Sequence, residues 1–149
     1  MMLYEVPVYR CKLERTSNLR VPHAEIKTPR HAADVIRMFL DEPDREHFCC
    51  LYLDPHNRPT GIELVSMGTQ ARVDLWVEHV FRGAVVSGCD KVIVAHNHPR
   101  GEAHPSPEDR ALTKELKVAG KILGIEIADH IILAGQDGWY SFKDGKRHR

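Results

Sequence analysis

The spacing of apolar residues in the first part of the chain predicts one strand followed by one helix. Residues Leu3 to about Leu13 alternate and are rich in tyrosine and valine, as strands often are. Thr28 and Pro29 predict a helix start, with threonine as the cap and proline in the first helical position. Residues 41–44 end this helix. Its apolar stripe consists of Ala32, Val35, Ile36, Phe39 and Leu40.

The middle of the chain predicts two strands and a second helix. Residues 48–53 are almost all apolar, and so short a run is typical of a strand that is buried on both faces. A turn at residues 55–59 leads to a strand from Ile62 to Met67, which Gly68 stops. The next helix closes near Gly88, and its apolar positions are Val73, Trp76, Val77, Val80, Phe81 and Ala84.

A third helix is predicted between two further strands. Residues Val92 to Val94 form a strand that leads into two histidines and is stopped by Pro99. Ser106 and Pro107, followed by two acidic residues, have the order of a helix start. Gly124 ends this helix, whose apolar face consists of Leu112, Leu116, Ala119 and Leu123.

The C-terminal segment predicts two strands and a tail. Residues 125–133 form the first strand, and a turn at residues 136–138 leads to the second at residues 139–142. The polar, basic residues 143–149 are predicted to be a disordered terminus. The predicted order is strand, helix, strand, strand, helix, strand, helix, strand, strand. Helices interspersed with apolar strands favour a layered α/β domain with a mixed central sheet.

Composition narrows the class of protein. A chain of 149 residues fits one domain, spanning residues 1–149, and is long enough for a core without disulfide or metal support. The net charge of zero disfavours a dedicated nucleic-acid binder, because such proteins gain affinity by neutralising phosphates. The four cysteines include no Cys-x-x-Cys pair and favour buried thiols in a reducing compartment. With neither a secretory signal nor an apolar run of membrane-spanning length, a cytoplasmic protein is expected.

Two histidines and one aspartate form a candidate metal site. His96 and His98 are two residues apart, so on a strand their side chains point to the same side. Asp109 falls in the first turn of the next helix, and the ten intervening residues are enough for the chain to fold back. A catalytic zinc needs three such ligands and one position for water, which then becomes a nucleophile near neutral pH. Manganese, iron, cobalt and nickel also bind such sites.

Each of these residues also has a simpler structural explanation. The two histidines could be polar residues at a strand end, and Asp109 an acid placed at a helix start. Ser106 is an ordinary helix cap by its position, although a capping hydroxyl still has a hydrogen to donate. Asp129 and His130 could orient a ligand imidazole or form a structural hydrogen bond. The joint spacing is what favours metal binding.

The same residues resemble a known family. His96-x-His98-Pro99 followed by Ser106-x-x-Asp109 resembles the JAMM (MPN+) metalloprotease signature. The string from residue 96 to 109 is closer still to the RadC-like branch. Further similarities are at residues 48–54, Gly68-Thr69, 123–125 and 129–132, so that the resemblance covers about residues 30–142. RadC-like proteins often carry an added N-terminal helical domain, and this chain is similar to the short members that stand alone.

The resemblance implies a fold and a set of roles. The fold would be a three-layer α-β-α sandwich of the JAB/MPN type, related to cytidine deaminases. His96, His98 and Asp109 would hold Zn²⁺, and Ser106 would donate a hydrogen bond to the developing oxyanion. Glu46, in the context Glu46-His47-Phe48, would bind the zinc water and shuttle its proton.

Two other glutamates, Glu63 and Glu78, are candidates for the role of base given to Glu46. Two further residues differ from the family pattern. Arg100 stands where the family usually has serine, and His104 where threonine is common. Arg100 could alter substrate preference and His104 could compete as a ligand, and neither change removes a catalytic group.

Four functions are compatible with these features to different degrees. The leading one is a zinc-dependent peptidase or isopeptidase that acts on a peptide or an isopeptide-linked protein. The second is a nucleic-acid module associated with DNA repair, in which Arg100, Arg110 and the basic tail would contribute and the metal site would be structural. A base deaminase is disfavoured because Asn97 and His98 replace its acid and its cysteine pair is missing. A scaffold that has lost catalysis is disfavoured by the complete ligand set. No membrane partner is expected, and apolar edge strands are compatible with a homodimer.

Overall fold

The computed structural model describes residues 1–41, 44–67 and 77–149. These residues form three helices and six strands. In chain order they are α1 (Pro29–Leu40), β1 (His47–Leu53), β2 (Pro59–Met67), α2 (Val77–Ser87), β3 (Lys91–His98), α3 (Pro107–Leu123), β4 (Glu126–Ala134), β5 (Gly138–Ser141) and β6 (Lys146–His148). Within the described ranges, no helix combines the length and the apolar character that crossing a bilayer requires.

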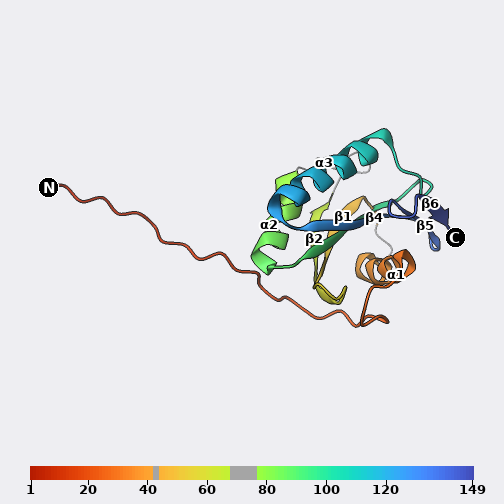
Figure 1. Ribbon diagram of the computed structural model, residues 1–149, viewed down its shortest axis with the longest axis horizontal. Helices are drawn as coiled ribbons and strands as arrows, with labels where there is room; N and C mark the ends of the chain where they lie inside the picture. The colour runs from red at the N-terminus through yellow and green to blue at the C-terminus, as the bar shows by residue number, and fades with distance from the viewer. Residues whose placement is uncertain (42–43, 68–76) are drawn as a thin grey trace.

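The strands form one mixed sheet with helices on both faces. The strand order is β2-β1-β3-β4-β5-β6, in which only β3 and β4 are parallel neighbours. Helix α1 lies on one face, and α2 and α3 lie together on the other (Figure 1). The predicted three-layer α/β fold with a mixed central sheet is therefore confirmed.

Alternating side chains of the central strands build two separate cores. On β1, Cys49, Leu51 and Leu53 pack with the buried stripe of α1. Phe48, Cys50 and Tyr52 point the other way and pack against α2 and α3. The nearly continuous apolar run of β1 is thus explained by burial on both faces, as predicted.

Helix α1 begins and packs as its sequence predicts. Thr28 caps it by accepting a hydrogen bond from the His31 amide at 3.3 Å, and Pro29 is in the first turn. The helix ends at Leu40. Four of the five predicted stripe residues are buried, namely Ala32, Val35, Ile36 and Leu40, and Phe39 packs partly buried against the same core.

The crossover from β3 through α3 to β4 positions the predicted metal ligands. Parallel strands need a long connection, and here α3 supplies it across one face of the sheet. The chain therefore leaves the carboxyl end of β3, and α3 begins close to that end. Ser106 caps α3 and Gly124 ends it in the left-handed conformation with φ 70°. Both boundaries of the helix agree with the prediction.

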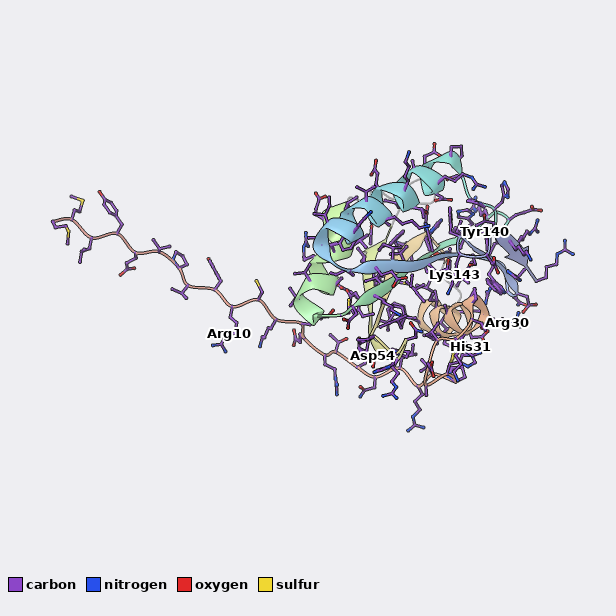
Figure 2. The ribbon with its side chains drawn as sticks, viewed as in Figure 1. Arg10, Arg30, His31, Asp54, Tyr140 and Lys143 are labelled. Carbon is purple, nitrogen blue, oxygen red and sulfur yellow. The ribbon has the colours of Figure 1, made fainter. Side chains whose placement is uncertain are left out.

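The strand predicted for residues 3–13 is wrong. Residues 1–20 form neither helix nor strand, and their side chains are exposed. This segment extends away from the folded part (Figure 1), and the labelled Arg10 lies well outside it (Figure 2). Alternation gives a segment the propensity for a strand, but a strand forms only where a neighbour supplies backbone hydrogen bonds. The sheet of the described residues does not include this segment as a neighbour of either edge strand.

The prediction of a disordered tail is also wrong. Residues Lys146–His148 form β6, which pairs with β5 and places Tyr140 opposite Arg147. The His148 imidazole stacks on the Trp139 ring at 3.9 Å between ring centroids. Gly145, with φ 65°, makes the turn that returns the chain to the sheet.

One part of the sequence prediction lies outside the described residues. Val73 and Trp76, which are predicted for the second helix, lie outside the described residues. The Gly68-Thr69 similarity lies outside them as well. Helix α2 buries Val80, Phe81 and Ala84.

Candidate metal centre

His96 and His98 lie at the carboxyl end of β3, on the side of the sheet that α2 and α3 cover. His96 is 1% exposed and stacks on Phe48 of β1, with 5.9 Å between ring centroids. His98 is the last residue of β3 and is half-buried. The sheet therefore fixes one imidazole in the interior and leaves the other at the surface, so that the pair is both held and accessible.

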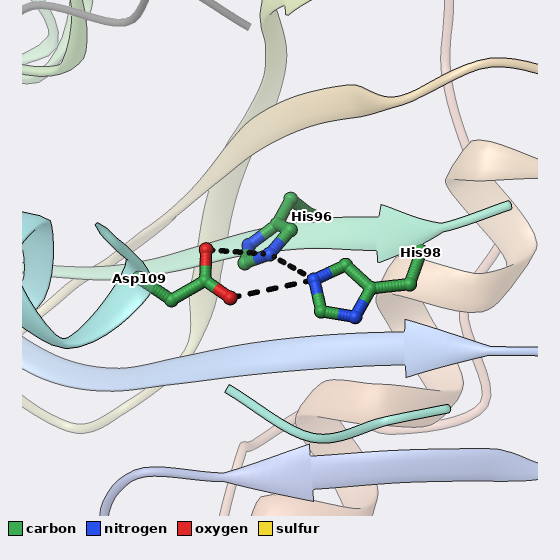
Figure 3. Close-up of side chains that lie close together, drawn as sticks. All are labelled: His96, His98 and Asp109. Atoms are coloured by element: carbon green, nitrogen blue, oxygen red, sulfur yellow. Dashed lines mark hydrogen bonds and ion pairs between the residues drawn. The ribbon is translucent and has the colours of Figure 1, made fainter. Parts of the chain in front are cut away.

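Asp109 reaches this pair from the first turn of α3 (Figure 3). Its amide donates to Ser106 Oγ at 3.0 Å, and its Oδ2 accepts from the Ser106 amide at 2.8 Å. This reciprocal capping box satisfies two amides of the helix start. It also holds the carboxylate at the end of the helix that faces β3.

The three side chains have the spacing of metal ligands. The Nε2 atoms of the two histidines are 3.0 Å apart, and they lie 3.2 and 3.4 Å from the Asp109 oxygens. Together the ligand atoms lie within 4.8 Å of one another. A tetrahedral zinc with bonds near 2.0–2.2 Å spaces its ligands roughly 3.3–3.5 Å apart. The donor set and its spacing therefore fit a divalent ion.

The Asp109 carboxylate is the main charged group of the site, and its hydrogen bonds to the two histidines shift the pKa values there. Burial alone would raise the pKa of Asp109, but hydrogen bonds from His96 and His98 hold it well below its ordinary value. Burial lowers the pKa of His98, and its hydrogen bonds to Asp109 and to the Glu102 carbonyl more than offset this and raise it. The carboxylate is thus ionised at neutral pH.

Glu46 is the best placed of the three candidate bases. It is half-buried and directly precedes β1, and its negative charge adds to the larger effects of Asp109 and the Glu102 carbonyl that raise the pKa of His98. Glu63 instead accepts a hydrogen bond from the Tyr52 hydroxyl. Glu78 is exposed on α2. The role of Glu46 as the base stays a prediction, as does that of Ser106 beyond its cap.

Asn97 was not singled out by the sequence, and it anchors the segment that carries Glu46. Its side chain accepts from the His47 amide at 2.7 Å and donates to the Arg45 carbonyl at 2.9 Å. Asparagine is disfavoured inside strands, so its presence between the two histidines indicates that its side chain makes a specific contact there. Through these two bonds, β3 holds residues 45–47 beside the end that bears His98.

The two departures from the family pattern lie in the loop between β3 and α3. Arg100 and His104 are both exposed. The cluster that could hold a metal among the described residues consists of His96, His98 and Asp109, and His104 is not part of it.

A cavity of about 560 Å³ adjoins the site through His98. A volume of this size is typical of ligand sites. It lies between α1, the end of β3 and the turn from β4 to β5. Arg37 of α1 fixes that turn by donating to the carbonyls of Gly135 at 2.7 Å and Gly138 at 3.0 Å. Of the three candidate ligands, His98 is the one that lines this cavity, and Leu40 and Leu133 in its wall belong to the core on the α1 side of the sheet.

The chain is similar to known proteins over most of its length. The family model described as RadC-like JAB domain matches residues 26–147. A UPF0758 protein of Desulforudis audaxviator is 38% identical over 118 residues, which is 79% of this chain and 51% of that protein. One of Methanosarcina mazei is 37% identical over 123 residues, or 83% of this chain and 53% of the other. This chain spans about half the length of these curated relatives.

Proposed function

The chain belongs to the RadC-like JAB-domain family, and from this premise we propose that it is a zinc-dependent peptidase or isopeptidase. JAB domains include metal-dependent hydrolases. The observation that carries the proposal is the group of three ligand atoms within 4.8 Å of one another, contributed by His96, His98 and Asp109. The substrate would be a peptide or an isopeptide-linked protein.

The ligand residues would hold the ion through three atoms. These are Nε2 of His96, Nε2 of His98 and one carboxylate oxygen of Asp109. A zinc ion bound there would polarise the scissile carbonyl and lower the pKa of water. The Nδ1–H of His98 donates to the Glu102 carbonyl at 2.9 Å, so that Nε2 is the nitrogen that would give its lone pair to the ion.

Glu46 and Ser106 would move the proton and stabilise the oxyanion. The carboxylate of Glu46 accepts a proton from the attacking water as the oxygen bonds to the carbonyl carbon. It then passes that proton to the amine nitrogen as the carbon–nitrogen bond breaks. The Ser106 hydroxyl donates to the carbonyl oxygen while that oxygen carries negative charge. Ser106 keeps its cap meanwhile, because the cap uses the lone pair of its oxygen.

Metal content provides the first test. We expect near-stoichiometric zinc in protein purified without added metal or a His tag, and none in a His96→Ala/His98→Ala variant, measured by elemental analysis. His104→Ala is the matched control, because this exposed loop histidine lies outside the cluster. A parent protein that holds no metal even after zinc is offered would contradict the proposal.

Cleavage provides the second test. We expect the zinc-loaded protein to cleave members of a panel of peptides and isopeptide-linked proteins. Glu46→Gln should keep its zinc and lose about 10²–10⁴-fold in rate, because a general base is removed. Glu78→Gln, which changes an exposed glutamate, should stay at the parent's rate. Unchanged cleavage by Glu46→Gln would remove the assigned mechanism, and a zinc-loaded protein inactive on the whole panel would remove the activity.

A nucleic-acid module remains the second candidate. It is favoured by two exposed arginines, Arg100 in the loop beside the site and Arg110 on α3. Part of the basic tail is neutralised, however, since Arg147 pairs with Glu102 at 2.8 Å. Affinity for DNA that falls steeply with salt concentration would support this candidate. Absence of binding at low salt would remove it.

A further inference from the structure

A chain of buried hydrogen bonds connects His96 to Asp109 through two residues that the proposed function does not use. His130 on β4 is fully buried, and its Nε2 lies 2.8 Å from Nδ1 of His96. Its other nitrogen, Nδ1, lies 2.6 Å from the Thr113 hydroxyl on α3. That hydroxyl lies 2.7 Å from the backbone carbonyl of Asp109. The chain therefore runs from His96 to Asp109 through His130 and Thr113.

The carbonyl at the end of this chain fixes the direction of every bond. A backbone carbonyl only accepts, so Thr113 donates its single hydrogen to Asp109. The Thr113 oxygen must then accept from the Nδ1–H of His130. The His130 ring is fully buried between the Thr113 hydroxyl and the imidazole of His96, and so buried a ring is stable in its neutral form. With the hydrogen on Nδ1, its Nε2 carries a lone pair. That lone pair accepts from the Nδ1–H of His96.

The result is a defined orientation of His96. Because Nδ1 keeps its hydrogen for His130, Nε2 is the nitrogen of His96 that would give its lone pair to an ion. This atom lies 3.0 Å from His98 Nε2 and 3.2 Å from Asp109 Oδ1. His98 reaches the same tautomer directly, through the Glu102 carbonyl. Both imidazoles thus turn Nε2 toward the candidate metal centre. For His98 the Glu102 carbonyl sets this tautomer, and for His96 the Asp109 carbonyl sets it through Thr113 and His130.

The packing around His130 keeps this chain rigid. Its ring stacks on Phe142 with 4.8 Å between centroids and an angle of 11°. Phe48 meets it edge-on from β1, with 5.9 Å between centroids, and also stacks on His96. Thr113 is 4% exposed on the inner side of α3. These contacts leave the His130 ring little freedom to rotate away from either partner.

We propose that Thr113 and His130 are positioning residues of the metal centre, which set the tautomer of His96 and link its orientation to the helix turn that carries Asp109. This inference rests on the proposed function, because it assigns the two residues a role toward the same ion. A purely structural role would predict that replacing them changes folding stability alone.

The sharpest test replaces the Thr113 hydroxyl by a methyl group of the same shape. Thr113→Val removes the acceptor of the His130 Nδ1–H, and Thr113→Ser retains it. Metal-depleted proteins are titrated with Zn²⁺ against a chelator, and Co²⁺ spectra report the ligand geometry. We expect the Kd for Zn²⁺ to rise about tenfold or more in the valine variant and its Co²⁺ bands to shift, as for other residues that orient ligands. The serine variant should bind Zn²⁺ within about twofold of the parent.

A second measurement needs no variant and no metal. Long-range ¹H–¹⁵N correlation spectra of the metal-free parent identify which ring nitrogen of His130 carries the hydrogen. We expect it on Nδ1. A hydrogen on Nε2, or equal Zn²⁺ affinity in Thr113→Val and the parent, would overturn the positioning role while leaving the metal site in place. A parent that binds no Zn²⁺ would instead remove the proposed function and this inference with it.

Discussion

At the scale of single residues, Asp109 belongs both to the cap of α3 and to the candidate metal centre. Its amide and one carboxylate oxygen complete the cap of α3, and both of its oxygens face the two histidines. Asparagine at this position keeps an oxygen for the cap and removes the charge. The cap and the charge can therefore be separated by one substitution.

We expect Asp109→Asn to destabilise the metal-free protein by about 1–3 kcal/mol near pH 5, because hydrogen bonds to a charged group are lost. The pKa of Asp109 is lowered in the folded state, so its contribution is present above its unfolded value of about 4 and is lost as pH falls further. The pKa of His98 is raised, so its contribution is present below about 6.5 and is lost as pH rises through the folded value.

The difference in unfolding free energy between parent and variant should therefore be largest between about pH 4 and 6.5 and should shrink on both sides. Urea denaturation with a chelator present measures it. Glu108→Gln is the matched control, since Glu108 is an exposed acid in the same helix turn. A difference that does not change with pH would show that the charge contributes nothing.

At the scale of elements, the close approach of α3 to the start of β4 depends on Gly120. A methyl group added there would meet the Ile125 carbonyl oxygen at less than contact distance, and also Ile127 and Phe81 at 3.4 Å. The amide of Ile125 also donates to the Gly120 carbonyl at 2.9 Å. The turn that closes α3 is therefore packed directly onto the helix.

Helix propensity favours Gly120→Ala by about 0.5–1 kcal/mol. We nevertheless expect this variant to be destabilised by about 1–3 kcal/mol, because the added methyl overpacks the junction. Thermal or urea unfolding measures the change. In Gly101→Ala the added methyl makes an ordinary contact at 3.6 Å, so this control should unfold like the parent. A more stable Gly120→Ala would mean that the helix moves at little cost.

At the scale of the whole molecule, the N-terminal segment stands apart from the sandwich. Residues 1–20 are exposed throughout and carry apolar side chains that remain in solvent, including those of Leu3, Val6 and Val8. The first residues that pack against the core are Val21 and Ile26.

Removing residues 1–20 should leave the unfolding free energy within about 0.5 kcal/mol of the parent, as for surface changes that break no contact. Denaturant unfolding at several protein concentrations measures this. Two results together would show instead that the segment pairs with a second copy. The truncated protein would be less stable, and the unfolding midpoint of the parent would depend on protein concentration. Light scattering of both proteins would then give the same answer independently.

The sequence predicted the secondary structure correctly where a few neighbouring residues determine where an element begins or ends. The Thr28 and Ser106 caps, the buried run of β1 and the left-handed Gly124 all define elements whose observed bounds agree with the prediction. The His96–His98 pair and Asp109 meet for the same reason, because a strand, a loop and a helix start follow one another along the chain. Local signals failed for residues 3–13 and 146–148, where the presence or absence of a neighbouring strand decides.

Sequence by itself therefore determined the candidate ligand set, the helices, the buried strands and the family. Only the tertiary structure decided which distant residues support that set. His130 reaches His96 because β4 lies beside β3, Asn97 holds residues 45–47 because β1 lies on the other side, and the cavity forms where α1 meets the turn fixed by Arg37. The physical reason is that strand order is set by burial across the whole sheet, and local spacing does not encode it.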